Sequence, residues 1–200
     1  MQVTLIQETP NPIETISKIA SICYDSDPKN PLGLVKHLYL SGHHSVFEHI
    51  YFTFKIEGIS RACSHQLVRH RMCSFTQRSQ RYCSEDGFMF VTPTTVDDGL
   101  FYNEMEELKD WYNYHQDKGV PNEDARYVLP NACCTELYLS CNLRELIHIA
   151  NERLCARAQW EIRELVKQMV EQVNPAFRFM LVPKCKSCRI ICNSPCEVKK

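Results

Sequence analysis

A segment rich in arginine carries the clearest chemical pattern in this sequence. Residues 69–82 read RHRMCSFTQRSQRY, and no Asp or Glu occurs anywhere from Gly58 to Ser84. Arginine presents a planar pair of N–H donors that matches phosphate and carbonyl oxygens. Because hydroxyl and amide side chains lie between the arginines, we predict a site for a small anionic ligand. The alternative is a structural segment whose arginines pair with acids elsewhere, such as the acidic stretch from Asp97 to Asp110.

A second polar pattern lies on a long predicted helix over residues 142–173. Asn142 and Arg153 are separated by about three helical turns and share a face, while Arg144 and His148 are neighbours one turn apart. Arg157 would follow one turn beyond Arg153. The alternative is a solvated helix face with ion pairs to nearby acids, namely Glu145, Glu152 or Glu161.

The chain has 12 cysteines, four of them close together near its end: Cys185, Cys188, Cys192 and Cys196. Four thiolates at short spacing can bind zinc, and reduced thiols or a disulfide are the alternatives. The other eight we expect to be mostly small buried hydrophobic residues: Cys23, Cys63, Cys73, Cys83, Cys133, Cys134, Cys141 and Cys155.

Length and composition favour one soluble domain. The chain has 200 residues, of which 44% are hydrophobic and 24% charged, with a net charge of -1. A nearly neutral protein lacks the broadly basic face typical of nucleic-acid binding. No signal sequence opens the chain and no apolar run approaches the roughly 20 residues of a membrane span, so we expect a cytoplasmic protein with reduced cysteines.

Interspersed helices and strands must position these side chains. We predict strands over 1–6, 51–57, 88–91 and 132–141, with a further short strand between 72 and 82. Helices are expected after an Asn11 cap with Pro12 in the first turn, through 34–38, from a Ser60 cap through 67, over 100–112, and in a short segment ending near Pro130. Gly58 is predicted to end the strand that begins at Tyr51.

These elements indicate an α+β fold: a single domain with a mixed or antiparallel sheet packed against a long core helix and several shorter helices. The six glycines are scattered and form no dinucleotide-binding fingerprint.

Within the arginine-rich segment, Arg69-His70-Arg71 is followed by seven residues and then Ser79. This RHR-x7-S pattern resembles the signature of the flavin-dependent thymidylate synthases. Three further blocks follow the family's order and spacing: Gly42 to His49, Ala125 to Pro130, and Asn142 to Glu161. The resemblance therefore covers residues 42–161 and implies a synthase domain over 1–180, followed by a Cys-rich basic tail over 181–200.

The resemblance implies FAD as the cofactor. Its contacts would be Ser45, Arg69, His70, Arg71, Gln77, Asn142, Arg144 and His148. His43 matches a family histidine near flavin and folate, which implies a positioning role. This chain has Thr76 and Gln77 at the positions where Asn and Glu, respectively, are frequent in the family. His148 stands where Asn is common, and Arg157 where His is usual.

The resemblance also implies that dUMP is methylated to dTMP, with 5,10-methylenetetrahydrofolate as carbon donor and NADPH as reductant. The nucleotide would be held by Gln66, Arg69, Gln77, Arg78, Ser79, Gln80, Arg81, Arg126 and Arg153. Arg153 would face the uracil and act as the catalytic residue, because a guanidinium there favours the negative charge that makes C5 nucleophilic. Ser79 would contact the dUMP phosphate or support its loop, and no covalent protein nucleophile is needed.

Family members are homotetramers with shared sites, which implies the same assembly here, with no membrane or nucleic-acid partner. Two other functions remain as alternatives. One is a zinc-stabilised, basic module that binds nucleic acid. The other is a flavoprotein reductase of different specificity, which would bind FAD but not dUMP.

Overall fold

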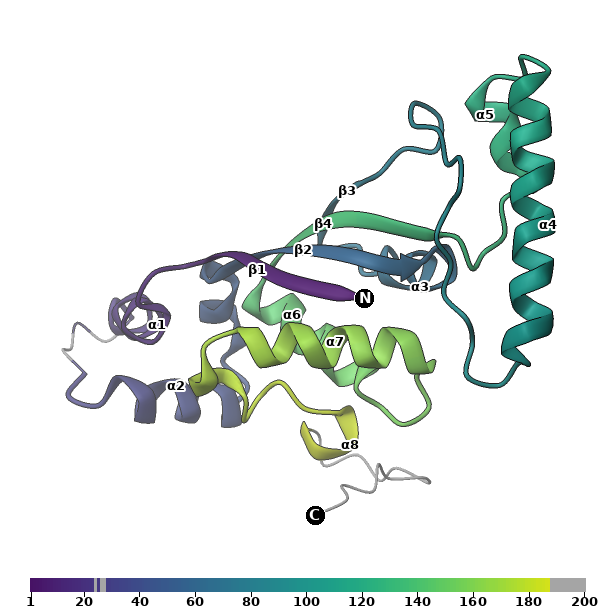
Figure 1. Ribbon diagram of the computed structural model, residues 1–200. Helices are drawn as coiled ribbons and strands as arrows, with labels where there is room; N and C mark the ends of the chain where they lie inside the picture. Colours follow the sequence, from purple (N-terminus) through teal and green to yellow (C-terminus); the bar gives the residue numbers. More distant parts are fainter. Residues whose placement is uncertain (24, 26–27, 188–200) are drawn as a thin grey trace. The chain divides into compact units, whose positions relative to one another are not determined.

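The computed structural model describes residues 1–23, 25 and 28–187. Helices and strands are interspersed along the described part of the chain, and the strands form one four-stranded antiparallel sheet, so the predicted α+β class is confirmed (Figure 1). The strands are β1 (Gln2–Glu8), β2 (Tyr51–Ser60), β3 (Ser74–Gln77) and β4 (Cys134–Asn142), in the spatial order β1-β2-β4-β3.

Backbone hydrogen bonds define the register of the sheet. The N–H of Thr9 donates to the carbonyl of Tyr51 at 3.0 Å, which pairs the end of β1 with the start of β2. The N–H of Arg78 donates to the carbonyl of Glu136 at 3.0 Å, which pairs the end of β3 with the beginning of β4. Each pairing joins the end of one strand to the start of the other, as antiparallel strands require.

Strand β2 follows its sequence pattern but runs further than predicted. Phe52, Phe54 and Ile56 are fully buried, and the residues between them are more exposed, as a half-buried strand requires. Gly58 does not end the strand, because its φ of +68° is accommodated within β2. A side chain at Gly58 would also lie 3.2 Å from the backbone nitrogen of Met1, so glycine is needed for close approach.

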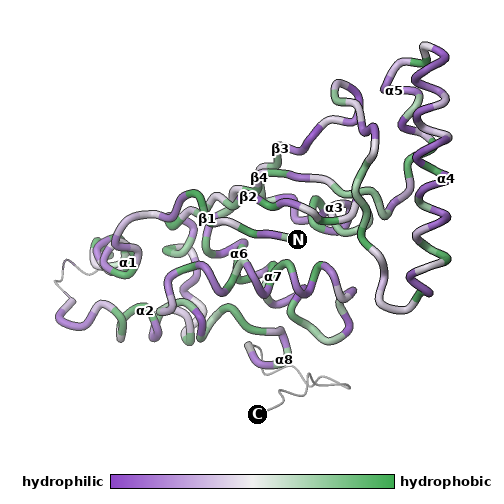
Figure 2. The backbone as a smooth tube through the Cα atoms, in the orientation of Figure 1, coloured by the Kyte–Doolittle hydropathy of each residue, from purple (hydrophilic) through white to green (hydrophobic). Residues whose placement is uncertain are grey.

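The chain divides into two compact units, and each of the four strands contributes residues to both. The first unit contains residues 1–2, 56–69 and 76–137. Its helices are α3 (Arg61–Leu67), α4 (Asp98–Asp117), α5 (Asn122–Ala125) and the 3-10 turn η2 (Arg126–Val128). Helix α3 begins as predicted, with the Ser60 hydroxyl accepting from the Cys63 N–H at 3.0 Å. Helix α4 is mostly hydrophilic (Figure 2) and packs against α5 and η2.

The second unit contains residues 3–55, 70–75 and the described residues from 138 onward. Its helices are α1 (Pro12–Ser21), α2 (Pro31–Leu40), α6 (Leu143–Arg153), α7 (Trp160–Gln172) and α8 (Lys184–Ser187), with 3-10 turns η1 (His44–His49) and η3 (Pro175–Phe177). Helices α6 and α7 pack side by side (Figure 1). The Leu5 N–H donates to the side-chain oxygen of Gln172 at 2.6 Å, which joins β1 to the end of α7.

The predicted single helix over 142–173 is wrong, because two helices occupy this range. Helix α6 is capped by Asn142, whose side chain accepts from the Glu145 N–H at 2.9 Å. Helix α7 has its own cap: the Gln159 side chain accepts from the N–H groups of Glu161 and Ile162 at 3.0 and 3.1 Å. The apolar period continues across the break, which is why periodicity alone did not reveal it. Arg157 therefore lies between the helices and not one turn beyond Arg153 on the same helix.

Two smaller predictions also fail. Asn11 precedes α1 in a left-handed conformation with φ of 46° and makes no side-chain cap, although Pro12 does occupy the first turn. The segment 88–91 forms only an isolated bridge between Phe90 and Cys133 instead of a strand. Within residues 1–23, 25 and 28–187, every helix is too short or too polar to span a lipid bilayer.

Candidate functional site

An open cleft of about 1020 Å³ lies along α6 in the second unit. Three residues predicted to contact flavin line this cleft: Asn142, Arg144 and His148. The lining also includes three residues that were not predicted as site residues: Tyr39, His44 and Glu48. Asn142 caps α6, so the helix amino terminus opens at the cleft, where its dipole favours negative charge. Arg144 is exposed and forms an ion pair with Glu48.

The paired histidines at the start of η1 have different environments. The ring of His44 stacks on Tyr39 with centroids 5.3 Å apart, and its Nε2 lies 3.0 Å from the Tyr39 carbonyl oxygen. His43 and Ser45, which were predicted to serve the flavin, are exposed, and neither is part of the cleft lining. His44 is therefore the histidine of this pair that lines the cleft.

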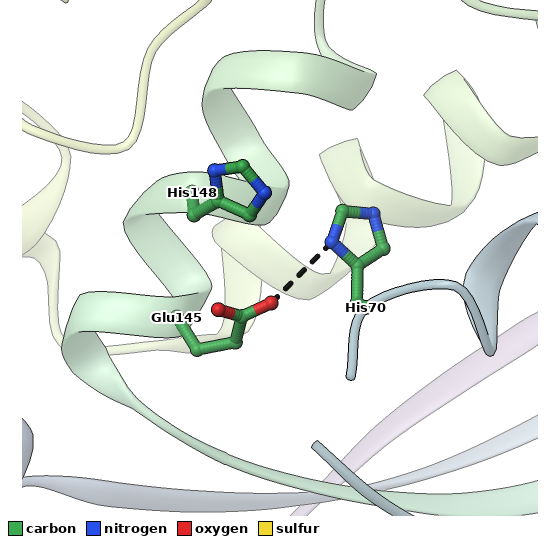
Figure 3. Close-up of side chains that lie close together, drawn as sticks. All are labelled: His70, Glu145 and His148. Atoms are coloured by element: carbon green, nitrogen blue, oxygen red, sulfur yellow. Dashed lines mark ion pairs between the residues drawn. The ribbon is translucent and has the colours of Figure 1, made fainter. Parts of the chain in front are cut away.

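A buried polar cluster adjoins the cleft at α6. His70 and Glu145 are only 5% and 8% exposed, and His70 Nδ1 lies 3.4 Å from a carboxylate oxygen of Glu145. Figure 3 shows these two side chains pointing toward one another, with His148 beside them on the same helix as Glu145. The rings of His70 and His148 meet edge to face, with centroids 5.5 Å apart.

The imidazole of His70 is neutral at physiological pH. Burial, followed by the positive charge of Arg153 and the neighbouring His148, lowers the pKa of His70 from 6.5 to about 4. Burial also raises the pKa of Glu145, and the nearby His148 opposes that shift. The contact between His70 and Glu145 is therefore that of a neutral imidazole with a carboxyl group and not an ion pair.

Arg153 completes this cluster from the end of α6. Its Nε–H donates to His70 Nε2 at 3.0 Å. Nε2 can accept only if it carries a lone pair, so the proton of the neutral ring must be on Nδ1, facing Glu145. Arg153, His70 and Glu145 thus form one polar chain that holds the Arg153 guanidinium in place.

The same cluster has the composition of a metal site, but its hydrogen bonds disfavour a cation. The ligand atoms of His70, Glu145 and His148 lie within 4.8 Å of one another. To bind a metal ion, His70 would have to offer a ring nitrogen with a free lone pair. Its Nδ1 carries the proton, and its Nε2 faces the positive charge of Arg153. We therefore interpret the cluster as a hydrogen-bonded support for Arg153.

A smaller cavity of about 360 Å³ lies in the first unit. It is lined by two residues predicted to bind the nucleotide, Gln80 and Arg126, together with Arg61 and His65. Nη2 of Arg61 donates to the carbonyl of Arg78 at 3.0 Å, whereas its buried Nε has no hydrogen-bond partner. A buried guanidinium donor without a partner favours an anionic ligand. Sequence reasoning missed Arg61 as a site residue, although it lies within the acid-free stretch.

Side-chain hydrogen bonds hold the loop that runs from the RHR triplet to Ser79 and Arg81. Gln77 donates through Nε2 to the hydroxyls of Ser64 and Thr135 at 3.1 and 3.2 Å, so its role in the structure is to support the loop. The Ser79 hydroxyl accepts from the Arg81 N–H at 3.2 Å. These bonds fix the loop conformation without any ligand.

Two arginines of this loop pair with acids elsewhere in the chain, which is the alternative stated for this segment. Arg78 forms an ion pair with Glu85 at 3.2 Å, and Arg81 pairs with Glu123. Neither partner belongs to the acidic stretch at 97–110. Arg69 and Arg71 are exposed, and Gln66 is half-buried.

The cysteines are less buried than expected. Only Cys63, Cys133 and Cys141 are buried among the nine described cysteines, so the prediction of mostly buried thiols is wrong. Burial raises the pKa of Cys133 to about 12, with a smaller contribution from Glu85, so this thiol is protonated and not a nucleophile. Of the predicted zinc ligands, Cys185 is half-buried in α8, and Cys188, Cys192 and Cys196 lie outside the described residues.

Comparisons with known proteins agree with the motif resemblance. The family described as thymidylate synthase complementing protein (Thy1) matches residues 4–177. The flavin-dependent thymidylate synthase of Geobacter sulfurreducens is 43% identical over 191 residues, covering 87% of this chain and 82% of that protein. The enzyme of the same name from Pyrococcus furiosus is 42% identical, covering 86% of this chain and 79% of that protein.

A solved structure confirms the fold independently. Thymidylate synthase X (ThyX) from Helicobacter pylori, crystallised with FAD and dUMP, superimposes with a TM-score of 0.81. The alignment covers 93% of this chain and 99% of that chain at 22% identity, a level that supports the fold alone. Together with the family match and relatives above 40% identity over most of their length, these findings show that the chain belongs to the flavin-dependent thymidylate synthase family.

Proposed function

We propose that this chain converts dUMP to dTMP by reductive methylation, with FAD as cofactor, 5,10-methylenetetrahydrofolate as carbon donor and NADPH as reductant. Relatives above 40% identity carry this enzyme's name, and the Helicobacter pylori structure contains FAD and dUMP. The observation that carries the proposal is the hydrogen bond from Arg153 to His70, whose other ring nitrogen lies 3.4 Å from Glu145, because this arrangement supports the arginine that the resemblance assigns to catalysis.

The cleft along α6 has side chains suited to the flavin. Arg144 and the amino terminus of α6 suit a phosphate, and His148 and Asn142 offer further hydrogen bonds. We infer that FAD is held by these residues with His70, Arg71, Ser45, Arg69 and Gln77. When bound, FAD supplies the hydride that reduces the transferred carbon, and the chain contributes binding and orientation.

The smaller cavity of the first unit suits the phosphate of dUMP. Arg126 and the unpartnered Nε of Arg61 supply positive charge, and Gln80 supplies an amide. We infer that Gln66, Arg69, Gln77, Arg78, Ser79 and Arg81 complete the nucleotide site. Arg81 and its partner Glu123 are both about half exposed, so this ion pair is weak enough for Arg81 to turn to a phosphate.

Arg153 would act on the uracil. Its guanidinium against the N3 and O2 edge stabilises negative charge on the ring, which makes C5 nucleophilic. Neutral His70 orients the guanidinium through Nε without adding a second positive charge. Ser79 serves the loop and phosphate, and no protein nucleophile takes part. His43 is assigned a positioning role toward flavin and folate.

The assembly follows from the resemblance. We propose a cytoplasmic homotetramer with sites shared between subunits, without membrane or nucleic-acid partners. The synthase domain would span 1–180 and the Cys-rich tail 181–200, where zinc binding stays a prediction. The nucleic-acid alternative is weakened because Arg78 and Arg81, two arginines of its proposed footprint, already pair with Glu85 and Glu123.

Flavin and nucleotide binding can be tested separately. Purified protein should take up FAD with a yellow flavin spectrum and oxidise NADPH faster when dUMP is present. FAD binding without any response to dUMP would favour the reductase of other specificity. Protein that takes up no FAD would contradict the proposal.

A further inference from the structure

Two cysteines face each other at the edge of the sheet. Strands β3 and β4 are antiparallel neighbours, and the Arg78 N–H donates to the carbonyl of Glu136 directly opposite. Continuing this register backward along β3 and forward along β4 places Cys73 opposite Cys141. Cys73 immediately precedes β3, and Cys141 is the second last residue of β4.

The register also gives the pair the spacing that a disulfide needs. Arg78 and Glu136 are a hydrogen-bonded pair, and pairs alternate along antiparallel strands, so the register extended one residue beyond β3 puts Cys73 and Cys141 at a position of the non-hydrogen-bonded class. Opposed residues of that class have Cα atoms about 4.5 Å apart, within the range of about 4.4–6.8 Å that disulfides span. The side chains are also hydrogen-bonded to each other.

The two thiols differ in access to solvent. Cys141 is only 3% exposed, whereas Cys73 is half-buried and can be reached from outside. The hydrogen bond with Cys73, together with burial, raises the pKa of the Cys141 thiol. Cys73 is therefore the residue that an oxidant meets first, and Cys141 is placed to respond from within the sheet.

We propose that Cys73 and Cys141 are a modification site, a cross-strand dithiol that a small-molecule disulfide such as oxidised glutathione converts to a disulfide bond. The Cys73 thiolate attacks one sulfur of oxidised glutathione, forming a mixed disulfide and releasing one glutathione thiolate. Cys141, after losing its proton to solvent, attacks the Cys73 sulfur and releases the second glutathione. Two protein thiols are oxidised and one glutathione disulfide is reduced to two thiols.

The bond would join two parts of the second unit that border the α6 cleft. Cys73 follows His70 and Arg71, and Cys141 precedes Asn142, the cap of α6. The bond also closes a long loop of chain, which constrains the unfolded state. We therefore expect oxidation to raise the Tm by several degrees, and dithiothreitol to reverse the rise. This inference does not depend on the proposed function.

Peptide mapping of the full-length protein tests the site. The protein is incubated with oxidised glutathione, its remaining thiols are alkylated, and it is digested with trypsin. We expect a linked pair of peptides, 72–78 and 127–144, whose fragments assign the bond to Cys141. A bond from Cys73 to Cys133 or Cys134, or unlinked peptides under conditions that oxidise a model dithiol, would overturn the inference.

Single variants separate the two steps. Cys141→Ala should leave Cys73 trapped as a glutathione adduct, because no second thiol can displace it. Cys134→Ala, in the same tryptic peptide, is the matched control and should form the bond as the parent does. Cys73→Ser, at the half-buried position, should lose both the linked peptides and the Tm rise. A Cys73→Ser protein that keeps the Tm rise would contradict the assignment.

Discussion

Arg153 donates from Nε to Nε2 of His70 at 3.0 Å, across 83 residues of sequence. This bond joins the end of α6 to His70 of the arginine-rich segment, and both residues belong to the second unit. It also determines where the proton of His70 lies, on the Nδ1 atom that faces Glu145. Two motifs that the sequence shows separately are thus joined by one hydrogen bond.

Removal of the Arg153 guanidinium should abolish dTMP formation. We expect Arg153→Ala to lower kcat/KM for dUMP by about 100-fold or more, the usual cost of losing a donor to developing charge. FAD binding, measured by titration of the flavin spectrum, should be largely kept. Arg153→Lys retains the charge without the planar fork, and we expect intermediate activity. Turnover by Arg153→Ala at the parent rate would reject the role of this residue.

Glu145 should matter through its contact with the Nδ1 atom of His70, at 3.4 Å. Glu145→Gln keeps a side-chain oxygen for the His70 Nδ1 proton, so it should retain most of kcat. Glu145→Leu removes the acceptor and should lower kcat about tenfold, equivalent to about 1.4 kcal/mol, with the rate expressed per bound FAD. Equal losses in the two variants would show that Glu145 acts only through folding.

The free energy of unfolding should fall in acid because of His70. Its folded pKa of about 4 lies below the usual 6.5, so the unfolded chain binds more protons between those values. Stability attributable to His70 is therefore present above pH 6.5 and is lost as the pH falls through about 4, by at most about 3 kcal/mol.

Urea unfolding at pH 7, 6 and 5 measures this loss. The raised pKa of Glu145 acts in the opposite sense, since the folded state then binds the carboxyl proton more readily. Comparison with His70→Gln isolates the histidine contribution, and this variant should lose less stability over the same range. Identical pH dependence in the two proteins would show that His70 is not held neutral.

Arg61 and Arg126 should bind the nucleotide and not the flavin. Loss of a charge-assisted hydrogen bond to phosphate costs about 1.5–3 kcal/mol, so Arg61→Ala and Arg126→Ala should each raise the Kd for dUMP about tenfold to 100-fold. Arg163→Ala on α7 serves as the arginine control. A normal dUMP affinity in both site variants, measured by calorimetry, would place the phosphate elsewhere.

Local patterns predicted much of the fold. The alternation of Phe52 and Phe54 predicts β2, and the hydroxyl of Ser60 predicts the start of α3, because both depend on neighbouring residues. The break between α6 and α7 could not be predicted from periodicity, since it depends on the cap supplied by Gln159. The prediction that Gly58 ends β2 failed because a positive φ can be accommodated inside a strand.

The candidate site was predicted through its motifs more than through its contacts. Residue types predict an anion site over Arg69 to Arg81, and the family resemblance predicts the role of Arg153. The role of Glu145 depends on its distance from His70, which no spacing in the sequence reveals. Arg61 became a site residue only through its unpartnered buried donor, which is a property of packing.

Transfer of a labelled carbon measures the proposed reaction itself. FAD-loaded protein is incubated with dUMP, NADPH and 5,10-methylenetetrahydrofolate carrying a labelled methylene carbon, and the nucleotide products are separated. We expect dTMP that carries the label, formed only when dUMP and NADPH are both present. Recovery of unchanged, unlabelled dUMP while FAD is fully bound would contradict the proposed function.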